Sequence, residues 1–216
     1  DPAREIQELP VVRQQQIVRP PLAWFALYES AHVTRGQALP SSGEYRIRDL
    51  IPSLGHEAFR AAFARVRGHL ADGDTYQVNY TFRIDGRFDG SPGKLLADLA
   101  TAQQCRHGAF ISVGRYAICS ASPELFFARE GQTLVTKPMK GTARRGRTTA
   151  EDERLRGALR ASPKERAENV MIVDMMRNDL GRIAEIGSVT VPSLFDAERY
   201  PNVWQMTSRV EARSTA

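Results

Sequence analysis

The feature that most constrains the fold is a long helix signal that begins at Ser162-Pro163. Ser162 is a favourable N-cap, Pro163 suits the first helical position, and Glu165 stands at the capping-box position. Apolar residues follow at Val170, Ile172, Val173, Met175, Met176 and Leu180, and Gly181 is a natural stop. The pattern predicts one long helix with an apolar face that packs on another layer.

Shorter patterns predict further elements. Apolar residues spaced by three and four predict a helix over 57–71, and Ser91-Pro92 opens another helix that runs to about Gln104. Aromatic and β-branched runs predict strands over 22–28, 76–84, 109–119, 125–130, 187–191 and 203–210, with one more that ends at Lys137. Helices and strands mix without a strict βαβ order or an internal repeat. This favours an α+β fold with helices packed on largely antiparallel sheet.

Composition excludes several classes of protein. No stretch approaches the roughly 18 apolar residues of a membrane span. Two cysteines without a metal-binding spacing are expected to be reduced thiols in a cytosolic protein. The net charge of +5 is concentrated in Arg144-Arg145-Gly146-Arg147. A nucleic-acid binder would carry a longer basic stripe or interleaved aromatics, so this charge fits a small dianionic substrate or a solvated loop better.

Four segments carry groups capable of chemistry, and none is a nucleotide, zinc or serine-hydrolase motif. They are Ser122-Pro123-Glu124, Lys137–Thr142, Glu165-x-x-Glu168 and Asp174–Asp179. Each has an ordinary structural alternative. The alternatives are a solvated strand-edge carboxylate for Glu124, a cap only for Glu165, a surface lysine for Lys140, and a buried network that ends the helix for Arg177-Asn178-Asp179. Spacing alone leaves these alternatives open.

Taken in order, five segments resemble the chorismate-utilising enzymes, which include anthranilate, aminodeoxychorismate, isochorismate and salicylate synthases. The segments are Gly73–Asn79, Ser122–Phe126, Lys137–Thr142, Glu165–Gly181 and Val203–Ser208. The resemblance makes residues 57–216 the N-terminal portion of a chorismate-binding catalytic domain, and residues 1–56 a poorly defined N-terminal segment. It implies an α+β fold with two packed, largely antiparallel sheets flanked by helices, and a requirement for Mg²⁺.

Two positions discriminate within the family. Isochorismate and salicylate synthases use water and carry a lysine base where this chain has Gln77, and a neutral amide cannot deprotonate water. Anthranilate synthases usually carry Ala where this chain has Lys140, whereas aminodeoxychorismate synthases carry Lys. Both positions favour the type called aminodeoxychorismate synthase component I, a transferase of para-aminobenzoate and folate synthesis. Anthranilate synthase component I remains the alternative.

The mechanism that the resemblance implies uses Lys140 as a nucleophile. Its amine adds at C2 of chorismate as the C4 hydroxyl leaves, and ammonia then adds at C4 and expels the lysine. Lys140 must be uncharged for this, a state that the nearby cations Lys137, Arg144 and Arg145 are expected to favour. Glu124 is the expected general acid and base.

The remaining roles also follow from the resemblance. Thr142 and the Gly141 backbone amide are expected to hold a substrate carboxylate or ring oxygen. Glu168 is the expected Mg²⁺ ligand, with Glu165 one turn earlier on the same helix face. Gln205 replaces a histidine of the anthranilate synthases and is therefore predicted to be a substrate contact, not an acid.

The implied partners are chorismate and a glutamine amidotransferase subunit or domain that supplies ammonia, in the cytoplasm and without nucleic acid or membrane. The family continues well past the Gln205 segment, with further Mg²⁺-binding glutamates. A truncated, non-catalytic chorismate-binding fragment is therefore a third possibility.

Overall fold

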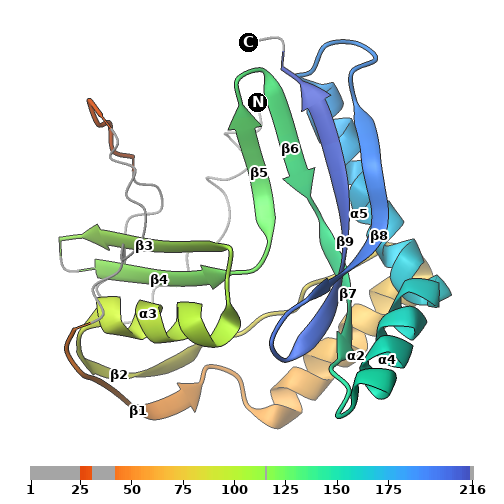
Figure 1. The fold of residues 1–216 in the computed structure, drawn as a ribbon. Helices are drawn as coiled ribbons and strands as arrows, with labels where there is room; N and C mark the ends of the chain where they lie inside the picture. The colour runs from red at the N-terminus through yellow and green to blue at the C-terminus, as the bar shows by residue number, and fades with distance from the viewer. Residues whose placement is uncertain (1–24, 31–41, 115, 215–216) are drawn as a thin grey trace.

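The largest sheet is built around one long strand, β9, and the smaller sheets stand beside it (Figure 1). The computed structural model describes residues 25–30, 42–114 and 116–214. The strands are β1 (Tyr45–Pro52), β2 (Ile84–Gly90), β3 (His107–Val113), β4 (Tyr116–Ser122), β5 (Leu125–Glu130), β6 (Thr133–Lys137), β7 (Met139–Arg144), β8 (Thr190–Arg199) and β9 (Val203–Arg213). The helices are α2 (His56–Asp72), α3 (Pro92–Gln103), α4 (Thr149–Ala161) and α5 (Pro163–Gly181).

Both sides of β9 are paired, and all of these pairings are antiparallel. β8 lies along one side, while β7 and β6 share the other side, and β5 continues the sheet from β6. Pro138 separates β6 from β7 and lacks a backbone N–H for the ladder. Its carbonyl still accepts a hydrogen bond from the Ser208 backbone N–H over 3.1 Å, so both strands stay against β9.

The main core lies between α5 and the large sheet. Val173 and Leu180 of α5 are buried there with Val210 of β9 and Leu134 of β6. A second cluster joins α4 to the sheet through Leu159, Trp204 and Met206. Burial of apolar side chains of this size contributes roughly 1.5–3 kcal/mol each, and this holds the helices on the sheet.

The two small sheets form a separate layer with α3 between them (Figure 1). β1 pairs with β2, and β3 pairs with β4. Ser91 caps α3, since its Oγ accepts a hydrogen bond from the Lys94 backbone N–H, and Pro92 opens the helix as predicted.

The predicted α+β class with antiparallel sheets and flanking helices is confirmed. The helix predictions over 57–71, 92–104 and 163–181 are also confirmed. The strand predicted over 187–191 is displaced, since β8 begins only at Thr190 and runs to Arg199. Three other strand predictions are wrong. Residues 76–83 form no strand, because Tyr80 and Phe82 pack on Phe59 of α2 instead of pairing. The run 109–119 is a hairpin that turns at Gly114, which has a φ of +56°.

The third wrong prediction concerns 22–28. Residues 22–24 lie outside the described part, and Phe25 to Tyr28 are exposed and irregular. Cys105 and Cys119 are free thiols, as predicted, and burial raises the pKa of Cys119. Within the described residues, no helix is both long and apolar enough to cross a membrane.

Candidate active site

Strand β7 carries three of the predicted site residues, Lys140, Gly141 and Thr142, and its neighbours bring further ones to it. Glu124 lies just before β5, and its Oε1 accepts a hydrogen bond from the Met139 backbone N–H over 3.0 Å. The carboxylate of Glu124 is therefore held one residue away from Lys140 along β7. Glu124 is exposed, so a partner molecule can reach it.

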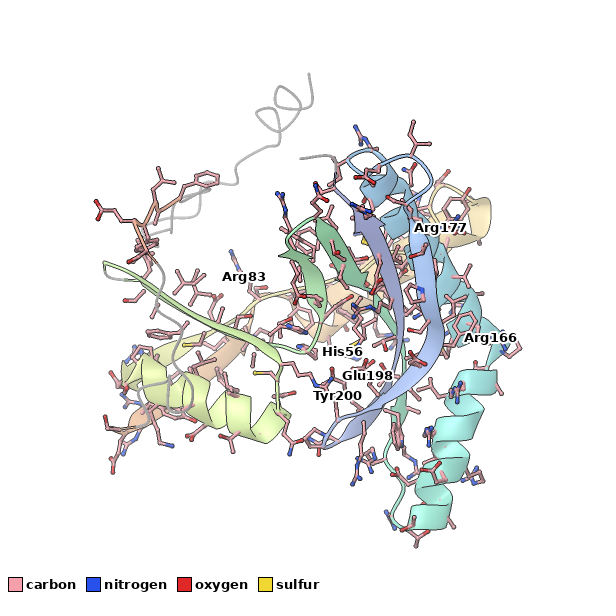
Figure 2. All side chains as sticks on the ribbon, turned by 45° about the horizontal axis from the view of Figure 1, so that its top comes forward. His56, Arg83, Arg166, Arg177, Glu198 and Tyr200 are labelled. Atoms are coloured by element: carbon pink, nitrogen blue, oxygen red, sulfur yellow. The ribbon has the colours of Figure 1, made fainter. Side chains whose placement is uncertain are left out.

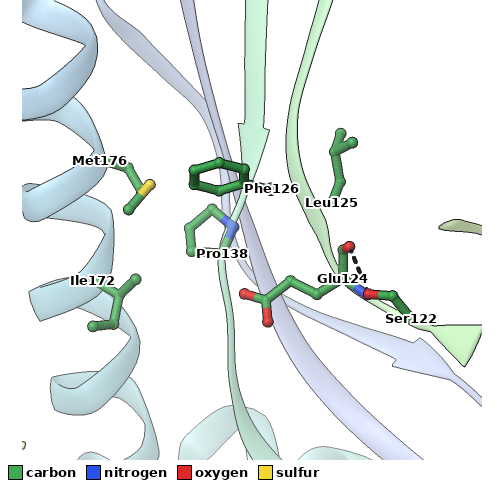
Figure 3. A pocket seen from close by; sticks show the side chains of 7 residues that line it. All are labelled: Ser122, Glu124, Leu125, Phe126, Pro138, Ile172 and Met176. Carbon is green, nitrogen blue, oxygen red and sulfur yellow. Dashed lines mark hydrogen bonds between the residues drawn. The ribbon is translucent and has the colours of Figure 1, made fainter. Parts of the chain in front are cut away.

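The Glu124 carboxylate borders a pocket of about 280 Å³ between β5 and α5 (Figure 3). The lining is Ser122, Glu124, Leu125, Phe126, Pro138, Ile172 and Met176. The Ser122 hydroxyl both accepts from the Glu124 backbone N–H and donates to its carbonyl, which fixes the turn. The pocket thus combines one carboxylate with an otherwise mostly apolar wall, as small-molecule sites commonly do.

Thr142 and Gln205 meet across the sheet. They are register partners on β7 and β9, and Thr142 Oγ1 donates a hydrogen bond to Gln205 Oε1 over 2.9 Å. The structure therefore brings together two residues that the sequence places far apart.

Gly141 lies against the first turn of α5. Its φ is +101°, and a methyl group there would come within 3.2 Å of Glu165 Oε2 and 3.1 Å of Met206 Cβ. The backbone conformation favours glycine, and a methyl group would force Glu165 or Met206 to shift slightly. The close approach brings Glu165 to the strand that carries Lys140.

Half of the predicted capping box forms. Ser162 caps α5, since its Oγ accepts a hydrogen bond from the Glu165 backbone N–H. The reciprocal bond is replaced, because the Ser162 N–H donates to the Leu159 carbonyl at the end of α4. The Glu165 carboxylate is therefore not used for capping and remains available for a cation.

Glu165 and Glu168 share one face of α5, as predicted from their spacing. The Lys164 ammonium lies 3.3 Å from Glu165 Oε1 and 3.4 Å from Glu168 Oε1, so one cation contacts both carboxylates. Within the described residues, no group of three or more His, Cys, Asp or Glu side chains offers a fuller metal site. Two carboxylates suit Mg²⁺, which binds few protein oxygens and keeps several waters.

Gln77 lies in the irregular segment after α2. Its Oε1 is buried without a hydrogen-bond partner, a property shared with only Thr136 Oγ1 among the described side chains. Leaving a buried acceptor without a hydrogen bond is costly.

The cations expected to surround Lys140 are engaged elsewhere, and this expectation is wrong. Arg144 pairs with Glu151, and Arg145 pairs with Asp152, both in the first turn of α4. Lys137 pairs with Glu198. Two of the three arginines in the basic loop are therefore held in ion pairs.

Asp152 is the centre of the Arg145 cluster. It accepts hydrogen bonds from the Arg145 side chain, the Gly146 N–H and Trp204 Nε1, and these bonds hold the pKa of Asp152 well below its usual range. Arg145 also donates to the Tyr200 carbonyl over 2.8 Å. The cluster ties the end of β7 to α4 and β9.

Glu198 and Tyr200 lie near the centre of the molecule (Figure 2). Neither residue belongs to a motif that the sequence singles out. Burial raises the pKa of Tyr200, and the negative charge of Glu198 adds to this effect. Although burial opposes it, the Lys137 ion pair and the Thr207 hydroxyl hold the pKa of Glu198 below its ordinary value. The Tyr200 hydroxyl donates to the carbonyl of Pro123, the residue before Glu124.

The Arg177-Asn178-Asp179 cluster is exposed, so it is not a buried network. Arg177 pairs with Asp174 one turn earlier, toward the opposite end of α5 from Arg166 (Figure 2). Such exposed pairs contribute little to stability.

Comparison with known proteins decides the family. The family model described as "chorismate binding enzyme" matches residues 8–216. The chain belongs to the chorismate binding enzyme family.

Curated proteins similar to this chain include two of the same name. Aminodeoxychorismate synthase component 1 of Klebsiella aerogenes is 39% identical over 76% of this chain and 36% of its own length. The Escherichia coli protein of the same name is 33% identical over 99% of this chain and 52% of its own length. The chain thus spans about a third to a half of the length of these relatives.

A solved member of the family has a similar fold. The crystal structure of anthranilate synthase component I from Streptococcus pneumoniae superposes with a TM-score of 0.69 at 29% identity. The superposed region covers 77% of this chain and 36% of the Streptococcus pneumoniae chain. The described elements are therefore those of a chorismate binding enzyme.

Proposed function

We propose that the chain belongs to an enzyme that converts chorismate and ammonia to 4-amino-4-deoxychorismate through a covalent adduct on Lys140. The observation that carries the proposal is the position of Lys140 on β7, between the strand end that holds Glu124 and the helix face that carries Glu165. The relatives named aminodeoxychorismate synthase component 1 support this reading.

The two displacements require a nucleophile and one proton carrier. The Lys140 amine forms a bond to C2, both ring double bonds shift along C1, C6 and C5 toward C4, and the C4–O bond breaks. Glu124 gives its proton to the departing hydroxyl, which leaves as water. Ammonia then bonds to C4, the two double bonds shift back, the C2–N bond breaks to release the Lys140 amine, and the proton that ammonia loses returns to Glu124.

The Glu124 carboxylate is suited to this double role by its position. The Met139 N–H orients one of its oxygens, and the pocket in Figure 3 leaves the rest of the carboxylate accessible. The same hydrogen bond keeps the acid near the strand that carries the nucleophile. Positioning of this kind is worth several orders of magnitude in rate.

The other polar residues bind substrate in this proposal. Gly141, Thr142 and Gln205 hold a carboxylate or ring oxygen of chorismate, and Thr142 and Gln205 are already paired. Gln77 favours ammonia over water because its amide cannot act as a base. Ammonia comes from a glutamine amidotransferase subunit or domain, and the product serves para-aminobenzoate and folate synthesis in the cytoplasm.

Glu165 and Glu168 are the residues that would hold Mg²⁺. When bound, the ion neutralises a substrate carboxylate and orients the ring. The chemistry at C2 and C4 is assigned to Lys140 and Glu124.

The second candidate is anthranilate synthase, the name of the solved relative from Streptococcus pneumoniae. Lys140 argues against it, because the anthranilate synthases usually carry Ala at this position. The third is a chorismate-binding fragment without catalysis.

The test is incubation with chorismate, Mg²⁺ and ammonium salts, followed by mass spectrometry of protein and product. We expect aminodeoxychorismate and a lysine adduct in the wild type and in Lys94→Ala, a control lysine on α3, but neither in Lys140→Ala. Anthranilate as the product would refute the proposal. Chorismate binding without any chemistry would favour the non-catalytic alternative.

A further inference from the structure

Strand β7 carries a bulge at Lys140. Met139 faces Thr207 and Thr142 faces Gln205, so Lys140 and Gly141 together oppose the single residue Met206. A bulge of this kind interrupts the ladder, bends the strand and re-aims the side chains at the extra residue. The positive φ of Gly141 accommodates the bend.

The bulge leaves backbone carbonyls that need partners, and Asn169 of α5 supplies them. Its Nδ2 lies 3.4 Å from the Lys140 carbonyl oxygen and 3.4 Å from the Met206 carbonyl oxygen. These two residues stand on opposite sides of the bulge. One side-chain amide therefore donates to both strands where their own pairing fails.

The orientation of that amide is fixed from the other side. Asn169 Oδ1 accepts a hydrogen bond from Ser208 Oγ over 2.5 Å, and Ser208 Oγ accepts one from the Phe195 N–H over 3.1 Å. Asn169 and Ser208 have relative exposures of 0% and 1%. A buried polar network with all its members paired is rigid and specifies one arrangement.

We infer that Asn169 is a positioning residue for Lys140, an inference that rests on the proposed role of Lys140 as the nucleophile. The amide holds the bulge that sets where the lysine side chain leaves the strand. Asn169 also directly follows Glu168, so the same residue fixes Lys140 relative to the helix face proposed to bind Mg²⁺. Sites work best when such supporting residues lock the reacting groups in place.

The main test compares Asn169→Asp with Val210→Ala. Asn169→Asp keeps the acceptor for Ser208 but removes both donated hydrogens. Val210→Ala removes an apolar group of equal burial on β9 with no contact to the bulge, and so controls for lost stability. A displacement of about 1 Å at the reacting group can cost about 10²-fold in rate. In Asn169→Asp we expect a kcat loss of that order, with KM within about threefold of wild type. In Val210→Ala we expect no loss of kcat of this kind at unchanged KM.

A second readout does not depend on turnover. Lys140 is labelled by reductive methylation at several pH values, and the modified peptide is quantified by mass spectrometry. We expect the rate at Lys140 to change in Asn169→Asp, and to a smaller extent in Ser208→Ala, while Lys94 is unaffected. If Asn169→Asp does not fold, the labelling rate of Lys140 in Ser208→Ala tests the positioning role instead.

Two outcomes separate the claims. Equal kcat, KM and Lys140 labelling in Asn169→Asp, Ser208→Ala and Val210→Ala would overturn the positioning role while leaving the proposed function intact. Wild-type turnover in Lys140→Ala would instead overturn the proposed function. The labelling comparison would then still report whether Asn169 holds Lys140.

Discussion

Thr142 Oγ1 donates a hydrogen bond to Gln205 Oε1 over 2.9 Å, across the two strands that frame the candidate site. Gln205 Oε1 is the acceptor in this bond, so the amide N–H groups of Gln205 remain to donate to a ligand. Thr142 is exposed and Gln205 is half-buried beside it. The pair therefore forms a ready hydrogen-bonding surface for an anionic substrate.

Removing the Thr142 hydroxyl should weaken substrate binding without unfolding the protein. Thr142→Val frees the Gln205 amide to rotate, and the loss of one hydrogen bond of about 1 kcal/mol lowers kcat/KM by about fivefold. Thr142→Ser keeps the hydroxyl and should retain most of the activity. Steady-state kinetics with chorismate distinguishes the two variants, and equal kcat/KM in both would exclude a role for the pair.

Gly141→Ala should destabilise the fold more than a comparable substitution elsewhere. Positive φ costs a non-glycine residue about 1–2 kcal/mol, and at Gly141 the new methyl group also presses on Met206 and Glu165. Gly187 has a φ of +80° but open space around it, so Gly187→Ala measures the backbone cost alone. Urea denaturation should show the larger loss at Gly141, and equal losses would contradict the close approach of α5 to β7.

Local signals explain which parts of the fold were predictable. α3 and α5 were predicted because caps such as Ser91 and Ser162 are written in the adjacent sequence. β7 was missed because Pro138 and Gly141 resemble a loop, and only pairing with the distant strand β9 makes it a strand. α4 was missed because nearly half of its residues are charged, and among its residues only Leu159 is buried.

The same division applies to the candidate site. Lys140, Glu124 and Glu168 were identified from motifs, whereas Asn169 gave no signal apart from being a polar residue within an apolar helix stretch. Its role depends on Ser208 and Lys140, which lie 39 and 29 positions away. The error about the cations near Lys140 has the same cause, since Lys137 finds its carboxylate in β8. Contacts between distant segments are not visible in a local pattern.

The Asp152 cluster predicts a specific pH dependence of stability. The folded state lowers the pKa of Asp152 below its ordinary value of 3.8. The ionised Asp152 carboxylate therefore adds fully to the free energy of unfolding above about pH 5. This stabilisation is lost as the pH falls toward the lower pKa that Asp152 has in the folded protein. Asp152→Asn should therefore unfold at a lower urea concentration than wild type at pH 7. The difference between the urea midpoints of the two proteins should narrow below pH 3.8. Glu153→Gln, an exposed neighbour paired only with Arg156, should track wild type at every pH. A gap that stays constant on acidification would contradict the assignment.

Lys164 predicts how the α5 carboxylates respond to a competing cation. Hydrogen bonds with Glu165, and then with Glu168, raise the pKa of Lys164, which shows that both carboxylates favour a positive charge there. Mg²⁺ bound to the same carboxylates must displace or repel this ammonium. Lys164→Gln should therefore tighten Mg²⁺ binding, whereas Glu168→Gln should weaken it. Because Lys164 is 74% exposed, the gain is limited to about two- to fivefold, the range of a solvent-screened ion pair.

Isothermal titration of the variants with MgCl₂ measures both effects, and Lys94→Gln provides the matched control. Lys94 also pairs with a carboxylate four residues away on its helix, Asp98, but lies on α3 beside the small sheets. Removing it changes the net charge by the same amount, so a general electrostatic effect would appear equally in both lysine variants. A gain confined to Lys164→Gln places the ion at Glu165 and Glu168. An unchanged affinity in both Lys164→Gln and Glu168→Gln would exclude this face of α5 as the site.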